Sequence, residues 1–353
     1  MRLFKFQSLI MANKISKIST VEIKSLWNRF DLKWELNSDV NILSGINGSG
    51  KSTILDCIAS LITIGQMPSL HQRPVEKITV TFDNGKFCSF EHLKVKDTVK
   101  NLEKKAQTDT RYKKIITELK ETEGTNYKKI KAVQVEMGIT SFDNMQMTLE
   151  ELSKILNIDV ISTFDNPIPD AGRKPDESVS TELDRDIFRL QKQYLDYQLN
   201  ISKKKDSIID NQENVKEEIE ELRRPQNRFL EIIDNLFKET DKKINRDKNE
   251  ITFTCGENEL SPYQLSSGEK QILVILLTVL VQDNKDSIIF MDEPEISLHF
   301  DWQKKLIQFI RDLNPNAQII LATHSPAIIM EGWRNKVKEV RDIRTADKMQ
   351  FKK

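Results

Sequence analysis

The sequence predicts an α/β fold, a mixed sheet with helices, that is built from the two ends of the chain and interrupted by a long helical insertion. Three observations predict it. Residues 40–45 form a β-branched run that ends at a glycine loop and leads into a helical pattern. Residues 287–291 and 319–323 are two further apolar runs of strand length. Between these ends lies a charged segment with helical periodicity.

Composition and charge limit the classes of protein to which the chain can belong. Lys and Arg together number 54, as do Asp and Glu, so there is no overall basic excess and any contact with nucleic acid would need a local patch. Cys57, Cys88 and Cys255 lie far apart, which speaks against a zinc site or a disulfide framework and fits a reducing compartment. The longest apolar run, residues 272–281, is too short to cross a bilayer, and the N-terminus lacks the features of a signal peptide. We therefore expect a soluble, cytoplasmic protein without a membrane partner, starting at Met1 or Met11.

The first half of the chain predicts a series of strands and helices. Residues 21–36 alternate in the manner of strands, and residues 52–65 carry apolar side chains at helical spacing. Residues 77–82 and 86–90 predict a hairpin that turns at Asn84 and Gly85. From 92 to 156 the composition is rich in Lys, Glu, Gln and Thr, which predicts exposed helices. Residues 158–165 then predict one strand.

A helical arm is predicted from residue 187 onward. Apolar residues recur at spacings of three and four over about five heptads, although Lys204, Asn211 and Glu218 interrupt the register toward the far end, and Pro225 should end the helix. A helix packed on its own domain and a two-stranded coiled coil both fit this pattern. Residues 227–239 predict another helix and residues 250–255 a strand. The arm positions are Ile187, Leu190, Tyr194, Tyr197, Ile201, Ile208, Val215 and Leu222.

The expected domain division has three parts. Residues 1–91 form an N-terminal lobe, residues 92–245 a mainly helical insertion with a strand near 159–164, and residues 246–353 a C-terminal lobe.

The stretch GINGSGKST, residues 45–53, matches the pattern GxxxxGK[ST]. Glycine permits the positive dihedral angles that aim successive backbone N–H groups at phosphate oxygens, and the following helix adds the positive end of its dipole. Lys51 should contact the β- and γ-phosphates, while Ser52 should give its hydroxyl oxygen to Mg²⁺. The alternative is an ordinary glycine turn before a helix. The residues expected to hold ATP here are Gly45, Asn47, Gly48, Ser49, Gly50, Lys51, Ser52 and Thr53.

Polar residues follow the two apolar strands near the C-terminus. Asp292 ends the first strand and can hold Mg²⁺, while Glu293 can polarise the attacking water as a general base. His324 follows the second strand, where an imidazole could contact the γ-phosphate. The alternatives are a solvated acidic pair and a structural histidine. With Lys51, Glu293 and His324 are the predicted catalytic residues, and Ser52 and Asp292 are the predicted metal ligands.

The stretch LSSGEKQ, residues 265–271, resembles the LSGGQ signature of ATP-binding-cassette (ABC) ATPases. The motifs occur in cassette order, and DEPEISLH followed by DWQ is similar to the DEPE-x-x-LHP-x-WQ pattern of the OLD-like AAA ATPases, with Phe300 where proline is frequent. The resemblance is to the SMC, RecF and OLD-like branch. It implies an ABC-type P-loop ATPase head carrying a partly coiled-coil insertion.

The resemblance also implies a head-to-tail homodimer, or a larger even assembly, with ATP and Mg²⁺ between subunits. The signature of one subunit would meet the γ-phosphate bound by the other, and residues 296–299 correspond to the D-loop, where His299 is either a contact across the interface or exposed to solvent. The residues placed across the interface are Ser266, Ser267, Gly268 and Glu269. The family's γ-phosphate-sensing glutamine has no clear counterpart, since Gln66 and Gln191 are poorly situated. Trp27, Arg29 and Phe30 are candidates for the adenine contacts, and the alternative is that they are two core aromatic residues and a surface cation.

Three functions fit these motifs. The chain resembles standalone OLD-type ATPases of bacterial phage-defence operons, including the PARIS kind, which implies an ATP-gated protein that holds a separate effector, such as a TOPRIM nuclease. Because residues 331–353 are short for a nuclease, we expect the effector to be a separate protein. A DNA-clamping repair ATPase of the RecF and SMC type is the alternative, and the run from Lys203 to Lys205 would then contact phosphates. A transporter ATPase subunit is a more distant alternative.

Overall fold

The computed structural model describes residues 15–63, 70, 73, 75–93, 107, 132–138, 149–161, 166–167, 178–211 and 214–347. The chain divides into two compact units. The first comprises residues 1–36, 56–155 and 341–353. The second comprises residues 37–55 and 156–340. Met1, Met11 and Gln66 lie outside the described residues.

The first unit contains an antiparallel sheet of six strands. Their order is β14-β2-β1-β4-β5-β6. The predicted hairpin is confirmed, because β4 pairs with β5 and Gly85 takes a φ of 79° in the turn between them. The predicted strands in residues 21–36 are confirmed as β1 and β2, which pair antiparallel. The bounds are β1 Ile18–Leu26, β2 Phe30–Glu35, β4 Lys77–Phe82, β5 Phe87–Leu93, β6 Ala132–Gly138 and β14 Arg344–Asp347.

The expectation of helices alone over residues 92–156 is wrong at β6. This segment pairs antiparallel with β5 over seven residue positions. The run AVQVEMG places two β-branched valines two positions apart, which is typical of a strand, and its pairing satisfies backbone groups of β5 that would otherwise be left open. Helix α6 (Leu149–Ile155) is the described helix in this range. The other helices expected there lie outside the described residues.

The second unit contains a parallel sheet of five strands. The order is β13-β3-β12-β11-β7, and each neighbouring pair is parallel. Every residue of β12 is buried, as expected of a strand covered on both faces. The predicted strands at 40–45, 287–291 and 319–323 are confirmed, whereas β13 was not predicted. The bounds are β3 Val40–Ser44, β7 Asn157–Ile161, β11 Ser287–Asp292, β12 Ala317–Ala322 and β13 Val337–Glu339.

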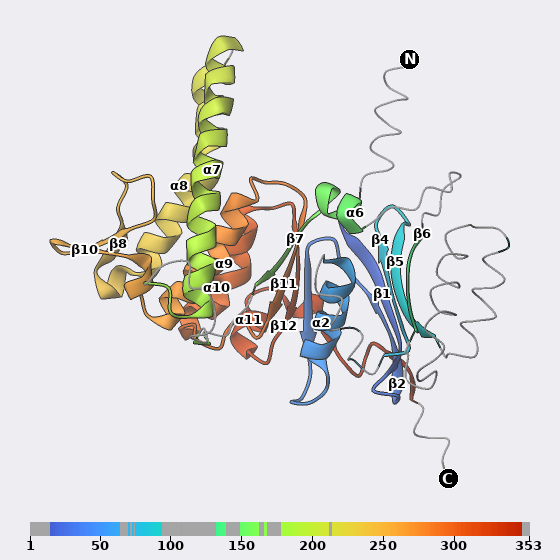
Figure 1. Cartoon of the computed structure of the whole chain (residues 1–353). Coiled ribbons are helices and arrows are strands. Elements are labelled where there is room, and N and C mark those ends of the chain that lie inside the picture. The colour runs from blue at the N-terminus through green and yellow to red at the C-terminus, as the bar shows by residue number, and fades with distance from the viewer. Residues whose placement is uncertain are drawn as a thin grey trace, which may run out of the picture. The chain divides into compact units, whose positions relative to one another are not determined.

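Helices and one apolar core complete the second unit. Helix α9 (Ser267–Val281) is buried over most of its length, and it packs against α7, α8 and α10. A small antiparallel sheet of β8 (Lys242–Ile244), β9 (Phe253–Cys255) and β10 (Asn258–Leu260) lies beside them (Figure 1). The remaining helices of this unit are α10 (Phe300–Leu313), α11 (Pro326–Met330) and the short 3-10 turns η2 (Lys238–Thr240), η3 (Pro262–Gln264) and η4 (Arg334–Lys336). Helix α2 (Lys51–Ile62) begins in the second unit, and its residues from Asp56 onward belong to the first. The helix predicted at 52–65 and the strand predicted at 250–255 are confirmed as α2 and β9.

The helical arm is a hairpin rather than one helix, and Pro225 does not end it. Helix α7 (Glu182–Asn211) and helix α8 (Val215–Leu236) lie side by side and project from the helical layer of the second unit (Figure 1). Asn214 is the N-cap residue of α8 and takes a φ of 49°, a conformation that asparagine tolerates. Pro225 lies inside α8, at a cost of about 3 kcal/mol that the burial of Phe229, Ile232 and Ile233 in the same helix offsets.

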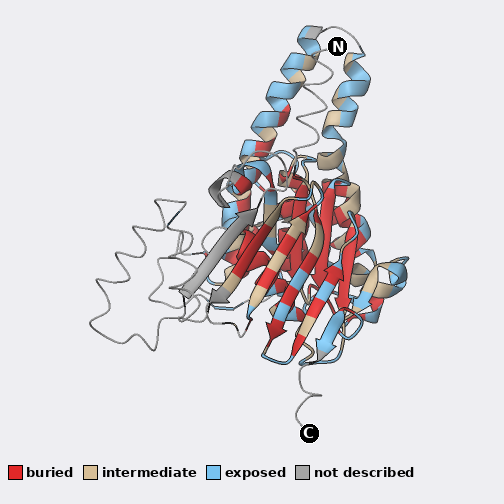
Figure 2. Ribbon diagram, turned by 90° about the vertical axis from the view of Figure 1, so that its right-hand side faces the viewer, coloured by how far each residue is buried: buried red, intermediate tan, exposed pale blue. Residues whose placement is uncertain are grey.

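Burial along the arm decides how it packs. Near its base, α7 buries Tyr194 and Tyr197. Tyr194 contacts Phe229 of α8, and its hydroxyl accepts a hydrogen bond from Gln226 at 3.0 Å. Toward the tip of the arm the residues are mostly exposed (Figure 2), and the apolar Ile209 is among the exposed ones. The apolar residues of α7 near the base of the arm thus pack against other residues of the same chain.

The described residues also show the lengths of the apolar helices and the surroundings of the three cysteines. None of the helices that the structure describes is long and apolar enough to cross a membrane. Cys57 and Cys88 are buried, and burial raises the pKa of both thiols to about 12, whereas Cys255 is half-buried.

Candidate nucleotide site

The glycine loop between β3 and α2 has the shape of a phosphate cradle. Gly45, Gly48 and Gly50 take φ values of 148°, 75° and 104°, which side chains rarely allow. A Cβ added at Gly45 would stand 2.9 Å from the Ser49 hydroxyl oxygen. The tip of the loop, with Ile46, Asn47 and Gly48, is exposed. The loop therefore presents backbone to its surroundings at the start of a twelve-residue helix.

Side chains of the loop also fit a bound phosphate. The Ser49 hydroxyl oxygen is buried, and it has no hydrogen-bond partner among the residues that the structure describes. The Ser52 side chain is exposed at the first turn of α2, and Thr53 is half-buried beside it. The residues predicted at this loop thus fit a phosphate group, which would supply acceptors for the backbone N–H groups.

Three predicted catalytic side chains meet next to this cradle. The Lys51 side chain is only 5% exposed, and its Nζ contacts His324 Nε2 and lies 3.5 Å from Glu293 Oε1. His324 Nε2 is also 3.5 Å from the same Glu293 oxygen. Lys51 Nζ donates a hydrogen bond of 3.4 Å to the carbonyl oxygen of Gly45. The structure therefore brings together residues that are more than 240 positions apart in the sequence.

The sheet register explains this meeting. In parallel strands the carboxyl ends lie at one edge, and here Asp292 pairs with Ala322, which in turn pairs with Leu43. Glu293 leaves β11 with a φ of 48°, while its N–H donates a hydrogen bond of 2.8 Å to the Ala322 carbonyl. Such a left-handed conformation is costly for glutamate. It turns the side chain toward Lys51.

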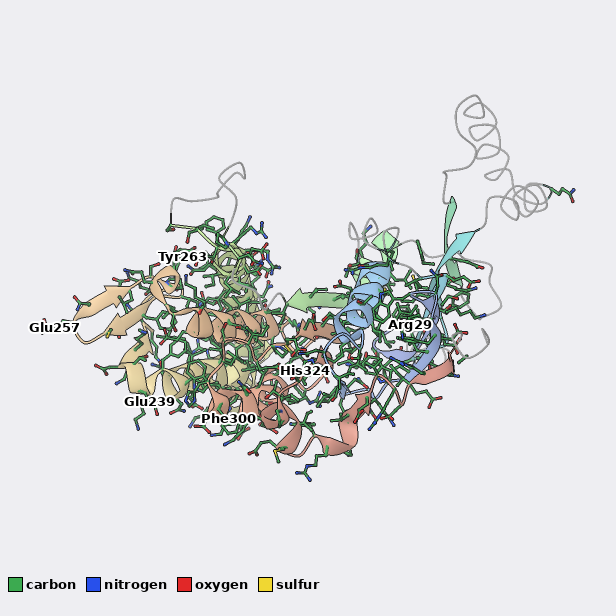
Figure 3. All side chains as sticks on the ribbon, turned by 90° about the horizontal axis from the view of Figure 1, so that it is seen from below. Arg29, Glu239, Glu257, Tyr263, Phe300 and His324 are labelled. Atoms are coloured by element: carbon green, nitrogen blue, oxygen red, sulfur yellow. The ribbon has the colours of Figure 1, made fainter. Side chains whose placement is uncertain are left out.

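His324 lies at the carboxyl end of β12 and is labelled in Figure 3. Partial burial and the ammonium of Lys51 lower its pKa, although Glu295 and Asp292 act in the opposite direction. The imidazole is therefore neutral near pH 7, and its Nε2 can accept a hydrogen bond from Lys51. A neutral ring can also donate or accept toward a phosphate oxygen, depending on the tautomer.

The predicted metal ligands are oxygen donors on two elements. Asp292 ends β11 half-buried, and Ser52 begins α2. Across the described ranges, no group of three His, Cys, Asp or Glu side chains gathers to hold a metal ion. Mg²⁺ suits such a site, since it is usually held by one or two protein oxygens together with phosphate and water.

The signature turn begins helix α9. Ser266 is the N-cap residue, and it forms a capping box with Glu269. Ser266 and Ser267 are exposed, so this helix start is accessible to a ligand or a partner.

Glu269 is occupied within its own subunit. It is 3% exposed and accepts hydrogen bonds from Lys242 at 2.8 and 2.9 Å and from Thr240 at 3.0 Å. Burial acts to raise its pKa, but the hydrogen bonds from Lys242 and Ser266 prevail and lower it. The position of this carboxylate favours a role in fixing the turn over a direct contact with phosphate.

Gly268 and Gln271 join the signature helix to the loop that follows β11. A Cβ at Gly268 would overlap the backbone carbonyl oxygen of Ser297. Gln271 is fully buried and donates a hydrogen bond of 2.8 Å to the carbonyl oxygen of Pro294. The glycine of the signature is thus required by close packing on residues 294–297.

The predicted D-loop is exposed beside this contact. Ile296 is 55% exposed and Phe300 58%, and His299 caps the N-terminus of α10 through Nδ1. Figure 3 labels Phe300 at the start of that helix.

Gln191 lies away from the cluster of Lys51, Glu293 and His324 in the second unit, whereas the adenine candidates belong to the first unit. Gln191 lies on α7, where its side-chain oxygen accepts a hydrogen bond of 3.0 Å from Ile251 N–H. Trp27 and Phe30 pack edge to face in the first unit, with ring centroids 5.8 Å apart, and Arg29 is exposed near them. No described residue is therefore assigned as the γ-phosphate-sensing glutamine or as an adenine contact.

Sequence reasoning missed Glu295. It accepts hydrogen bonds from the His324 segment. Its signal was its place two residues after Glu293 in a strand-end motif, but only the fold shows what it contacts.

A parallel sheet whose strand ends carry a glycine loop, an Asp-Glu pair and a histidine defines the class of P-loop ATPases. Residues 40–331 match the family described as "AAA domain, putative AbiEii toxin, Type IV TA system", and the chain belongs to that family.

Relatives with assigned names extend this comparison. The Septu protein PtuA of Bacillus thuringiensis is 26% identical over 346 residues, covering 91% of this chain and 74% of its own length. The Retron Vc95 probable ATPase of Vibrio cholerae is 28% identical over 146 residues, which is 38% of this chain and 28% of that protein.

Among solved structures, an Smc head bound to the C-winged helix domain of ScpA has a TM-score of 0.51 at 15% identity. The match covers 89% of this chain and 91% of that one. The predicted fold, an ABC-type ATPase head, is confirmed.

Proposed function

We propose that this chain is a Mg²⁺-dependent ATP hydrolase. The observation that carries the proposal is the convergence of Lys51, Glu293 and His324 beside a glycine cradle. A lysine ammonium and backbone N–H groups are the donors that a triphosphate requires, and a carboxylate beside them is the usual base for attacking water.

Each side chain then has one task. The loop residues Gly45 to Thr53 hold the phosphates, with Lys51 neutralising negative charge. Ser52 and Asp292 would hold Mg²⁺, which supplies charge stabilisation at the phosphates when bound. Glu293 orients and deprotonates water, and His324 contacts the terminal phosphate.

A second copy of the chain is the proposed partner at the signature turn. Ser266 and Ser267 are exposed at a helix N-terminus, as a contact with another subunit's γ-phosphate would need. Glu269 holds this turn in shape. Hydrolysis would remove a group that both subunits bind and thereby loosen a homodimer or a larger even assembly.

The proposed biological role is bacterial anti-phage defence, in which ATP-dependent dimerisation gates a separate effector protein. The match to a Septu protein along most of the chain and the partial match to a retron ATPase support it. The alternative role as a DNA clamp draws less support from the arm, because the ammonium of Lys204 is paired with Asp283 at 2.5 Å.

Two substitutions test the ATPase and dimer proposals. Lys51→Ala should weaken ATP binding by about 10- to 150-fold, the equivalent of the ~1.5–3 kcal/mol of a hydrogen bond to a charged group. Glu293→Gln should retain ATP binding, lower turnover by about 10²- to 10⁴-fold and accumulate a dimer. Equilibrium binding of ATP, phosphate release and sedimentation velocity measure these effects.

Exposed residues supply the matched controls. Lys338→Ala in β13 and Glu331→Gln after α11 should leave all three measurements unchanged. Undiminished hydrolysis in Glu293→Gln would refute its assigned role. A monomer at every ATP concentration would reject the dimer while leaving the ATPase proposal intact.

A further inference from the structure

Glu295 stands in the tight turn that follows β11. The turn is closed by two backbone hydrogen bonds, from Ile296 N–H to Glu293 O at 3.3 Å and from Leu298 N–H to Glu295 O at 2.9 Å. The side chain of Glu295 lies against residues 323–325, which contain His324.

One oxygen of this carboxyl group accepts from three donors. Glu295 Oε1 accepts a short hydrogen bond from the Thr323 hydroxyl and two more from the N–H groups of His324, at 3.1 Å, and Ser325, at 3.0 Å. Thr323 is fully buried. Because one oxygen accepts from three consecutive residues, it holds the backbone of residues 323–325 in one position.

The same contacts connect Glu293 with His324. The N–H of His324 lies 3.1 Å from Glu293 Oε2 as well as 3.1 Å from Glu295 Oε1. A shift of the His324 backbone would therefore change the distance between its imidazole and Glu293.

Gln303 on α10 ties the other side of this segment. Its amide donates to the Leu298 carbonyl at 2.9 Å, and its oxygen accepts from the Ser325 hydroxyl at 2.7 Å. The loop after β11 and the loop after β12 are thus joined twice, by Glu295 and by Gln303.

The site of Glu295 is costly for a carboxyl group. Burial and the neighbouring Glu293 raise its pKa, although the hydrogen bond from Thr323 lowers it. Its second oxygen, Oε2, is buried with no hydrogen-bond partner among the described residues. An apolar side chain would be buried at this position at a lower cost in free energy, so packing does not explain why a glutamate stands here.

We propose that Glu295 is a positioning residue, which sets the distance between His324 and Glu293 by holding the backbone of residues 323–325. The inference rests on the proposed ATPase activity. Among the described residues, the hydrogen bonds of the Glu295 carboxyl group go to residues 323–325 and not to the glycine loop, so its loss should affect the chemical step rather than the binding of ATP.

The test compares Glu295→Ala and Glu295→Gln with the exposed control Glu331→Gln. Alanine removes the acceptor and should lower kcat by about 10- to 100-fold, as expected when catalytic groups are displaced by about 1 Å. KM and the ATP dissociation constant should stay within about threefold of wild type, since no phosphate contact is lost. Glutamine keeps an acceptor oxygen of the same reach, so Glu295→Gln should recover most of the lost kcat.

If Glu295 only stabilised the fold, Glu295→Ala and Glu295→Gln would both lower the thermal stability, and neither would lower kcat while leaving KM unchanged. A kcat of Glu295→Ala within about threefold of wild type would overturn the inference. If Glu295→Ala does not fold, Thr323→Val decides, because it removes one donor and keeps the shape: a fall in kcat with unchanged KM supports the inference, and an unchanged kcat overturns it. A wild-type protein that binds but never hydrolyses ATP would instead refute the proposed function.

Discussion

A buried ion pair between Lys270 and Asp184 anchors the signature helix to the base of the arm. Lys270 Nζ lies 2.7 Å from Asp184 Oδ1, and the two residues are 8% and 1% exposed. Asp184 also accepts hydrogen bonds from Ser180 and Thr181 through its other oxygen, at 2.9–3.1 Å. Lys270 is two residues beyond Gly268, so this pair supports the turn that we place at the subunit interface.

The substitution Asp184→Asn should destabilise the protein strongly. Asparagine keeps the shape and one acceptor oxygen, and the hydrogen bonds that start α7 can survive. The ammonium of Lys270 is left buried without its counter-charge, which costs about 3–5 kcal/mol. In Asp184→Asn/Lys270→Met no charge remains in the site, so the double variant should return to within about 1–2 kcal/mol of wild type.

Urea denaturation followed by circular dichroism measures the three free energies of unfolding. The exposed pair Arg224 and Glu221 supplies a control, since removing either charge should cost less than about 1 kcal/mol. A loss below about 1 kcal/mol in Asp184→Asn would refute the reasoning. So would a double variant no more stable than the single one.

Two further predictions concern the same region. Gly268→Ala should lower the free energy of unfolding by about 1–3 kcal/mol and reduce ATP turnover, because the added Cβ overlaps the Ser297 carbonyl oxygen. At the control position Gly256 nothing lies within 4 Å, so Gly256→Ala should cost only about 1–2 kcal/mol of left-handed backbone strain and leave turnover unchanged. Equal turnover in the two variants would contradict this prediction. The stability difference between wild type and Asp184→Asn should depend on pH. Burial acts to raise the pKa of Asp184, but Lys270 and Ser180 lower it below the ordinary value, so the difference is full above about pH 5 and shrinks as the pH falls through the lowered pKa. Denaturation between pH 7 and pH 3 measures this difference, and a constant difference would show that the charge of Asp184 is not the cause.

Local motifs were predictable because their chemistry depends on neighbours in the sequence. The glycine loop requires only a strand before it and a helix after it, and both appear as apolar periodicity in residues 40–65. The arm shows where such reasoning fails. Its heptad register continues through the polar Asn211 to Val215, so the division into α7 and α8 was not visible, and Pro225 was given more weight than the packing of Phe229 and Ile232 allows.

The roles of polar residues divide in the same way. Glu269 was placed toward phosphate by resemblance, yet its carboxylate is bound by Lys242 from a strand that follows the arm. Glu295 was not singled out, although it contacts the segment of His324. Burial and partners of this kind come from residues distant in the sequence, and no periodicity records them.

By itself, the sequence determined the class of fold, the phosphate loop and the strand ends that carry Asp292, Glu293 and His324, because these follow from short-range patterns of apolar and polar residues. Only the tertiary structure decided that Lys51, Glu293 and His324 meet, that Gly268 packs on Ser297 and that the arm folds back on itself. The physical reason is that parallel pairing sets which strand ends are neighbours, and close packing sets which side chains are buried together.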